Sequence, residues 1–287
     1  MITLQAQADG IRVEQWCEGP AVYLDHWAWR RISEDVSLAM TFARALGVSG
    51  GTLAMSWLNL VEFCRVTDPE QRRKADALLD QVLPRVFFLD PDFFKVIGAE
   101  NRMLAGSSPE APHSDSASLK GFVKLNLLRP GSLELLPPQR LFQLIPDTGI
   151  ATKFDEFADL VVAKIRSMQE EHVRDKGFRR LVRRPPRGPT VQRGTRFLAR
   201  ELLGAFFEPG ARLDRSDAID VCHAVVAVAY CDVALLDGRW VAQVEKARKR
   251  LSEVGMSFPV AQVFSERGGG LGDFLHRLTA IPKAPGH

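Results

Sequence analysis

Cysteine is scarce in this chain, and the spacings that usually accompany functional cysteines are missing. The four cysteines, Cys17, Cys64, Cys222 and Cys231, include no CxxC pair. Neither a zinc site nor a framework of disulfides is therefore predicted. Reduced thiols in a cytoplasmic protein are the simplest interpretation.

Long hydrophobic runs are missing too. No apolar stretch approaches the roughly 18 residues that a membrane-spanning helix needs, and the first residues lack the basic segment and apolar core of a secretory signal. The sequence thus predicts a cytoplasmic protein without a membrane partner. The formal net charge of +3 over 287 residues is too small to indicate a polyanionic partner by itself.

Several motifs of common enzyme classes do not occur. There is no GxGxxG after a predicted strand, no GxxxxGK[ST], no HExxH and no GxSxG. Dinucleotide-dependent enzymes, P-loop enzymes, zinc proteases and serine hydrolases therefore lack their usual signals. The GGGLGD run that begins at Gly268 follows the last predicted strand, and we interpret it as a linker that leads into a short helix.

What the chain does contain is an alternation of short apolar strands and helices. Hydrophobic residues make up 46% of it, which is enough to fill a sizeable core. One predicted helix begins at Ser33 as N-cap and ends at Gly47, and another covers the apolar segment 50–68. Strands are predicted at 21–25, 85–90, 233–237 and 257–265, and further helices at 68–84, 217–230 and 241–255.

This alternation is typical of a parallel sheet with right-handed crossovers, so the predicted fold class is α/β. The middle of the chain differs in character from the two ends. We predict a core formed by residues 1–97 and 214–287, interrupted by a mostly helical insertion at 98–213. The insertion contains a polar stretch, 105–118, interpreted as a flexible loop, and a basic segment.

Four acidic residues are predicted to meet at one rim of the sheet. Asp25 and Asp237 stand at the carboxyl ends of strands, where open parallel sheets bind ligands. Asp220 lies in the first turn of the helix that precedes the second of these strands, and Glu62 lies on the helix at 50–68. Carboxylates about 4 Å apart repel by roughly 4 kcal/mol per pair, so the cluster needs a cation. Oxygen ligands favour Mg²⁺ or Mn²⁺.

The same residues resemble the pattern of PIN domains, a family of metal-dependent nucleases. Asp220 opens an alanine-rich helix that leads to a short strand ending at Asp237, Asp25 looks like the first acid of that family, and SWLNLVEF around Glu62 looks like its helical glutamate. The resemblance covers about 21–92 and 214–264. The chain departs from the pattern after the first acid, where His26 and Trp27 replace a small polar pair.

The resemblance implies a three-layer α/β/α fold and a metal-dependent nuclease, as in the endoribonucleases of toxin–antitoxin pairs. It implies that Asp25 and Asp237 are the principal metal ligands and that Asp220 shares the metal or orients the attacking water. Glu62 would bind water in the outer shell. The resemblance implies either a ribonuclease or a structure-specific nuclease, and we predict RNA as the substrate of this chain.

Each acid also has a structural interpretation. Asp25 could cap a backbone amide, and Asp237 could form a turn with Gly238. Asp220 could simply be an acid near a helix N-terminus, where the helix dipole stabilises negative charge. Glu62 could pair with Arg65. Two further acids, Asp217 and Asp232, could substitute in the site, while His223 is interpreted as a packed core residue.

A basic segment from 176 to 200 is the candidate surface for nucleic acid or for an acidic inhibitor protein. Arginines can hold phosphates with two hydrogen bonds at once, although a solvated run of charge is the alternative. A catalytically silent PIN-like module that binds RNA or protein, and a phosphohydrolase of small esters, are the competing functions. The sequence is also compatible with a homo-oligomer. The candidate nucleic-acid ligands are Arg179, Arg180, Arg183, Arg184, Arg187, Arg193 and Arg196.

Overall fold

The computed structural model of the chain describes most residues of both the predicted core and the predicted insertion. The described residues are 1–8, 10–66, 68–106, 111–125, 127–128, 131–132, 141–177, 179, 194–207, 211–253 and 258–281.

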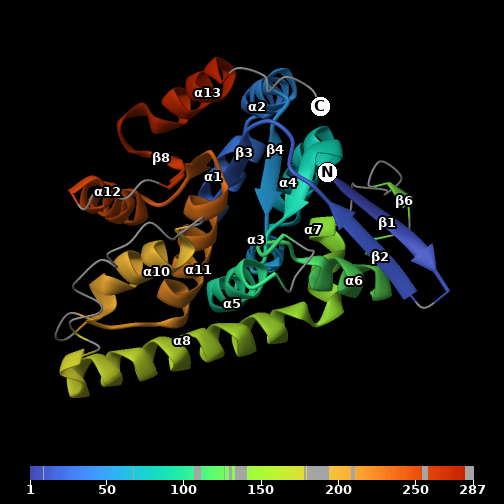
Figure 1. Cartoon of the computed structure of the whole chain (residues 1–287). Helices are drawn as coiled ribbons and strands as arrows, with labels where there is room; N and C mark the ends of the chain where they lie inside the picture. Colours follow the sequence, from blue (N-terminus) through green and yellow to red (C-terminus); the bar gives the residue numbers. More distant parts are fainter. Residues whose placement is uncertain are drawn as a thin grey trace.

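A five-stranded parallel sheet forms the centre of the molecule (Figure 1), which confirms the predicted α/β class. Its strand order is β5-β4-β3-β7-β8, with every neighbouring pair parallel. The strands are short, and all except the edge strand β8 are buried at every residue, so those four show little alternation of polar and apolar residues. Their bounds are β3 Ala21–Leu24, β4 Thr52–Met55, β5 Val86–Phe88, β7 Val233–Leu235 and β8 Gln262–Phe264.

Strand β4 corrects the prediction of one helix over 50–68. Only the second part of that segment is helical, as α3 (Trp57–Cys64), and Thr52–Met55 is a strand between β3 and β5. All four residues of β4 are buried, so their apolar side chains merged with the helical pattern that follows. Gly50, in the left-handed region at φ 69°, ends the preceding helix and separates it from the strand.

The predicted helix with Ser33 as its N-cap corresponds to the second of two successive helices, whose N-cap is Asp35 and not Ser33. Helix α1 (His26–Glu34) is capped by Asp25, and α2 (Val36–Ser49) is capped by Asp35, whose carboxylate accepts hydrogen bonds from two backbone amides. Ser33 lies buried inside α1 and donates its hydroxyl to the carbonyl of Arg30 at 3.0 Å.

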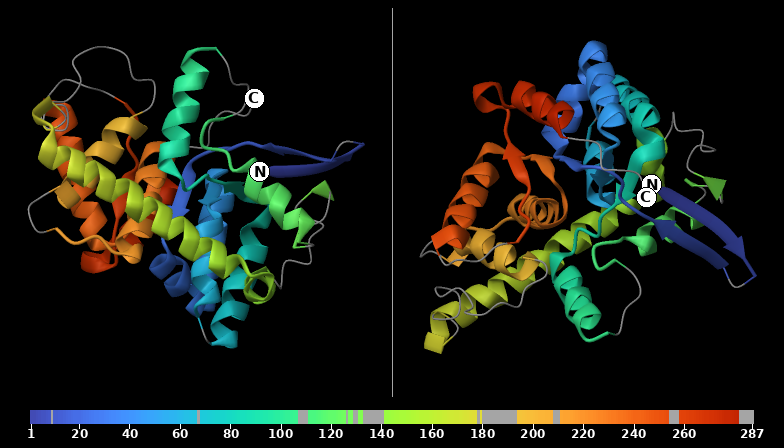
Figure 2. Two further views of the ribbon diagram at one scale, coloured as in Figure 1. Left: turned by 90° about the horizontal axis from the view of Figure 1, so that it is seen from below. Right: turned by 45° about the horizontal axis from the view of Figure 1, so that its top comes forward.

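Helices cover both faces of the sheet and form a three-layer α/β/α arrangement. On one side α1 and α2 pack against α4 (Pro69–Val82), which begins at Asp68 and Pro69 as predicted, and α13 (Gly270–Ala280) packs on α2. On the other side α10 packs against α11 and α12 (Figure 2, right). These three helices are α10 Thr195–Leu203, α11 Arg215–Tyr230 and α12 Gly238–Glu253.

A β-hairpin that the sequence analysis did not predict begins the chain. Strands β1 (Ile2–Gln7) and β2 (Gly10–Gln15) pair antiparallel, and the short β6 (Gly131–Ser132) pairs with β1. Ile2 and Leu4 are buried on one face of β1, which gives the alternation expected of a half-buried strand.

The segment 98–213 is largely helical where it is described. It contains most of α5 (Phe93–Leu104), then α6 (Ser116–Lys124), α7 (Leu141–Leu144) and α8 (Ile150–Arg174), and it ends with α10. Its apolar residues belong to the same hydrophobic core as the sheet. In the predicted loop 105–118, residues 107–110 lie outside the described residues, whereas Ser114 forms a bridge to Leu89 and α6 begins at Ser116.

Helix α8 crosses the end of the sheet to which the parallel strands point. It runs below α3, α5 and α11 in Figure 1, and the view from below in Figure 2 shows it in front of them. It packs on both α3 and α11. None of the described helices is long and apolar enough to cross a membrane.

Candidate active site

Asp25 and Asp237 follow the two strands at the point where the strand order reverses. Strand β3 ends at Leu24 and pairs with β7, which ends at Leu235. The backbone N–H of Asp25 continues this pairing by donating to the carbonyl of Leu235 at 3.0 Å. From β3 the chain proceeds to β4 and β5 on one side, and later to β7 and β8 on the other. Such a switch point is where open parallel sheets bind ligands.

Glu62 and Asp220 approach the same rim from two helices. Helix α3 begins directly after β4, with Ser56 and Asn59 forming its capping box, and it carries Glu62 with 17% of the side chain exposed. Helix α11 begins at a capping box of Asp214 and Asp217, so Asp220 lies in its second turn rather than the first.

Asp25 and Asp220 interact electrostatically with each other and with Glu62 and Asp237. Although part of Asp25 is exposed, burial of its carboxyl, helped by the charges of Glu62 and Asp237, raises its pKa to about 6. Burial and the charges of Asp25, Glu62 and Asp237 raise the pKa of Asp220 to about 7. Like charges brought together out of water disfavour ionisation of each other.

His223 is the residue at this rim whose role the sequence analysis missed. It is only 3% exposed, as the prediction of a core residue requires, but its Nε2 atom lies 3.5 Å from Oε2 of Glu62. Burial alone would lower the pKa of His223, yet the charges of Glu62, Asp25 and Asp220 outweigh it and raise the pKa. The spacing of three residues from Asp220 was the available signal, because it places both side chains on one helix face.

A buried chain of hydrogen bonds orients His223 from behind. Asn59 donates from Nδ2 to the hydroxyl of Tyr23 at 3.1 Å, and that hydroxyl contacts Nδ1 of His223. Asn59 is itself held because its Oδ1 accepts the backbone N–H of Ser56 at 2.8 Å. When Tyr23 donates to Nδ1, the proton of a neutral imidazole must be on Nε2, facing Glu62.

The donor chemistry of the site fits a hard divalent cation, whereas the arrangement is not a ready-made ligand shell. Among the described residues, no three His, Cys, Asp or Glu side chains lie close enough together to hold a metal ion. Yet Oε2 of Glu62 is buried, and its contact with Nε2 of His223 at 3.5 Å is too long for a normal hydrogen bond. A buried carboxylate oxygen left in this state costs free energy that a cation or its water would recover.

The structural interpretations of the acids hold in part. One oxygen of Asp25 accepts the backbone N–H of His26 at 2.8 Å, and one oxygen of Asp237 accepts that of Arg239 at 3.0 Å. Both acids therefore begin a helix, and each has a second carboxylate oxygen besides the one that accepts this hydrogen bond. Glu62 faces His223, since Arg65 pairs with Asp155 instead.

The two additional acids have other contacts. Asp217 belongs to the capping box of α11 and forms an ion pair with Arg239. Asp232 precedes β7, at the opposite end of the strand from Asp237, where its carboxylate accepts the backbone N–H of Ala21 at 2.7 Å. Asp232 is thereby separated from the candidate site by the length of the strand.

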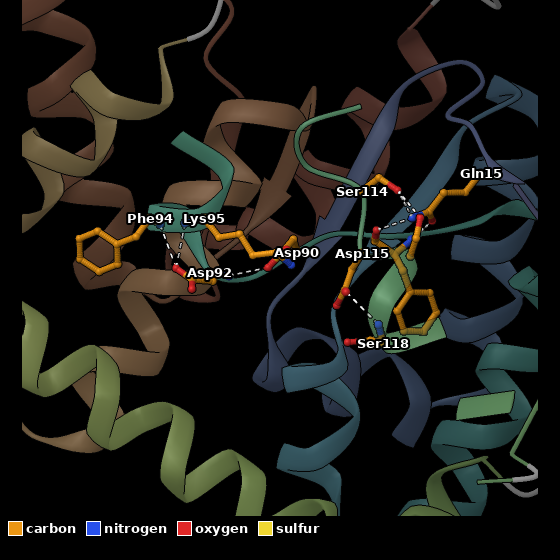
Figure 3. Close-up of polar contacts among 10 residues, drawn as sticks. Gln15, Asp90, Asp92, Phe94, Lys95, Ser114, Asp115 and Ser118 are labelled. Carbon is orange, nitrogen blue, oxygen red and sulfur yellow. Dashed lines mark hydrogen bonds and ion pairs between the residues drawn. The ribbon is translucent and has the colours of Figure 1, made fainter. Parts of the chain in front are cut away.

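A further polar cluster follows β5 at the edge of the sheet (Figure 3). Asp90 is 5% exposed and pairs with Lys95, and Asp115 caps α6 by accepting the N–H of Ser118 at 3.0 Å. Burial, together with the charge of Asp115, raises the pKa of Asp90 to about 6. Because each carboxylate has a partner, these contacts anchor α5 and α6.

Most of the predicted nucleic-acid ligands lie outside the described residues. This applies to Arg180, Arg183, Arg184, Arg187 and Arg193. Arg179 is half-buried just after α8, and Arg196 is exposed in the first turn of α10.

Comparison of the chain with protein-family models, curated proteins and solved structures finds no match. The resemblance to PIN domains therefore rests on the residues themselves, and the function that follows from it is a proposal.

Proposed function

We propose that this protein is a metal-dependent nuclease that hydrolyses phosphodiester bonds, with RNA as the preferred substrate. The observation that carries the proposal is the mutual electrostatic interaction of Asp25, Glu62, Asp220 and Asp237 beside the switch point of the sheet. Carboxylates that repel one another here favour a cation, and a phosphodiester brings further negative charge that a cation neutralises.

The four acids have different roles in this proposal. Asp25 and Asp237 hold Mg²⁺ or Mn²⁺, Asp220 shares the ion or orients the attacking water, and Glu62 binds water in the outer shell. The ion, when bound, supplies an activated water and neutralises charge on the phosphorus oxygens. His223 positions Glu62 and offsets part of the negative charge of the cluster, because its field lowers the pKa of Asp25 and Asp220.

The test is cleavage of end-labelled single-stranded RNA and DNA in the presence of Mg²⁺, Mn²⁺ or EDTA. Asp220→Asn should abolish metal-dependent cleavage and leave the fold intact. Asp273→Asn, on the exposed surface of α13, is the matched control, because it removes the same charge at a distance from the acids. Cleavage that survives in Asp220→Asn and also in Asp25→Asn would overturn the proposal.

A result of no cleavage, with metal-independent binding of RNA that weakens with salt, would favour the catalytically silent module. Hydrolysis of nucleotides but not of polymers would favour a phosphohydrolase of small esters. An acidic inhibitor protein stays a prediction of the family resemblance.

A further inference from the structure

Two arginines on the acid-bearing helices share a pair of carboxylates from α8. Nη2 of Arg65, at the end of α3, lies 2.6 Å from Oδ1 of Asp155. Arg215, in the first turn of α11, holds both oxygens of Asp159 through Nε and Nη2, each at 2.6 Å. Nη1 of Arg215 also lies 3.7 Å from Oδ1 of Asp155. The four side chains therefore form one alternating cluster.

This cluster lies on the same side of the sheet as the candidate active site. Arg65 follows Glu62 by one helical turn, and its backbone N–H donates to the carbonyl of Glu62 at 3.2 Å. Arg215 is on the helix that carries Asp220, closer to the end from which that helix begins. Helix α8 crosses this rim (Figure 2), so its carboxylates meet the arginines where a substrate would approach.

The ion pairs are not needed to hold α8 in place. Its apolar face contributes Phe154, Ala158, Val161 and Ile165, each at most 3% exposed, to the core. Trp57 of α3 adds edge-to-face contacts with two phenylalanines of α8. By contrast, the four charged side chains are between 44% and 57% exposed. Ion pairs with that exposure contribute about 0–1 kcal/mol each to stability.

The chemistry of the arginines matches phosphate as well as carboxylate. The two-point contact of Arg215 with Asp159 is the geometry in which a guanidinium also binds two phosphate oxygens. Asp155 and Asp159 are four residues apart on α8, so they present two negative charges on one helix face, as successive phosphates of a strand would.

We propose that Arg65 and Arg215 bind phosphate groups of the substrate strand beside the acids, and that Asp155 and Asp159 occupy this phosphate-binding position in the free protein. The inference rests on the proposed nuclease function, which supplies the strand. Binding of the strand exchanges three weak ion pairs within the protein for the phosphate contacts of two arginines.

The experiment measures binding of a fluorescent single-stranded RNA to the full chain in EDTA, by anisotropy, between 50 and 200 mM salt. Neutralising the competing carboxylates, as Asp155→Asn with Asp159→Asn, should tighten binding by about threefold or more at low salt. The matched control is Glu170→Gln with Glu171→Gln, which removes the same charge from the exposed far end of α8. The control should change affinity less.

The arginines themselves give the second measurement. Arg65→Gln with Arg215→Gln should weaken binding and reduce the slope of log K against log salt by about 1.4, the value for two lost phosphate contacts on a single strand. Arg65→Lys with Arg215→Lys keeps the charge and should still bind more weakly than the wild type. Lysine lacks the planar guanidinium that binds two phosphate oxygens at once.

Each other outcome overturns the inference. An Asn pair that binds no more tightly than its Gln control would show that the cluster only joins the helices, and an unchanged salt slope in the Arg65/Arg215 variants would do the same. Absence of RNA binding in every protein would also overturn it. If no protein binds RNA in EDTA but metal-dependent cleavage is lost in Asp220→Asn, the phosphate-binding inference fails and the nuclease proposal stands. If the variants bind RNA as expected but no protein cleaves it, Arg65 and Arg215 bind phosphate as inferred and the nuclease proposal fails.

Discussion

His223 and Glu62 face each other across the junction of α11 and α3, with Nε2 and Oε2 3.5 Å apart. Neither atom has another hydrogen-bonding partner among the described residues, and both are buried. The pair links the two helices that bring Glu62 and Asp220 to the rim. The charge of His223 also lowers the pKa of Asp25 and Asp220.

Tyr23→Phe should disturb His223 without touching the acids directly. The hydroxyl of Tyr23 is the contact that holds Nδ1, so its removal leaves a buried ring nitrogen without a partner, at a cost of about 1–3 kcal/mol in the free energy of unfolding. At a pH above the raised pKa of His223, where the ring is neutral, we expect nitrogen-15 NMR of the imidazole to show the Nε2–H tautomer fixed in the wild type and a mixture in the variant.

Tyr230→Phe is the control for this prediction. Its hydroxyl donates to Glu100, in a different part of the core, so it should lower stability while the His223 signals stay as in the wild type. An unchanged His223 tautomer in Tyr23→Phe would contradict the orientation assigned to the ring.

The metal-free protein should lose stability as the pH rises from about 4 to 7. Folding raises the pKa of Asp25 to about 6 and that of Asp220 to about 7, from ordinary values of 3.8. In this interval the folded state binds more protons than the unfolded state, so the free energy of unfolding falls with increasing pH. Asp220→Asn should flatten this slope and raise stability at pH 8 by roughly 1–3 kcal/mol.

Urea denaturation in EDTA at several pH values measures this slope, with Asp273→Asn as the variant that should leave it unchanged. Addition of Mg²⁺ or Mn²⁺ at pH 8 should stabilise the wild type and have less effect on Asp220→Asn, because the ion binds the ionised cluster. A wild-type slope of the opposite sign would show that these carboxyl groups are stabilised, not penalised, by the fold.

The sequence predicted the parts of the fold in which local pattern and burial agree. The strands that end before Asp25 and Asp237 are flanked by breakers and acids, and the helix between Asp217 and Tyr230 is long and apolar, so their class was clear. Strand β4 was missed because a central strand buried on both faces has no alternation. The hairpin was missed because the alternation in β1 is confined to Ile2 and Leu4, while its last three residues are exposed.

The candidate site could be predicted only as far as acids mark strand ends. Asp25 and Asp237 could be predicted from their positions at strand ends, because a parallel sheet places the carboxyl ends of its strands along one rim. The spacing from Asp220 was a signal for His223 alone, and its contacts with Tyr23 and Asn59 could not be predicted, since they join residues from three separate elements. Such contacts depend on the register of the sheet and on helix packing, which composition and periodicity do not encode.

Lys95→Met should destabilise the protein, and more strongly at high pH. Lys95 is the ion-pair partner of the buried Asp90, and burial with the charge of Asp115 already raises the pKa of Asp90 to about 6. Without the ammonium group that pKa should rise further, so the folded state is penalised as the pH rises above it. We expect a loss of about 1 kcal/mol at pH 8, since the half-exposed ammonium is screened by solvent.

The comparison is between pH 5 and pH 8, by thermal or urea denaturation. At pH 5 Asp90 is protonated in both proteins and the difference should be small. Lys153→Met, on the exposed surface of α8, is the control for loss of a lysine. A destabilisation that is equal at both pH values would assign the effect to packing of the lysine stem and not to the ion pair.

Gln15→Ala should loosen the hairpin from the sheet. The side-chain amide of Gln15 pairs with the backbone of Phe88 as a neighbouring strand would. Its Oε1 accepts the backbone N–H of Phe88 at 2.9 Å, and its Nε2 donates to the Phe88 carbonyl at 3.2 Å. Nε2 also donates to the hydroxyl of Ser114 at 2.6 Å. Removal of the amide leaves the N–H of Phe88 without its partner, whereas the Phe88 carbonyl still accepts the N–H of Asp115 at 3.0 Å. The lost hydrogen bond should cost about 1–3 kcal/mol.

Hydrogen exchange distinguishes this local effect from general destabilisation. In Gln15→Ala the amide of Phe88 should lose protection, and so should the amides of the hairpin, while those of β3 and β7 keep theirs. Gln5→Ala, on the exposed face of β1, is the matched control and should leave the Phe88 amide protected. If Phe88 exchanges equally slowly in both variants, the amide of Gln15 does not close this edge, and other contacts hold the hairpin to the sheet.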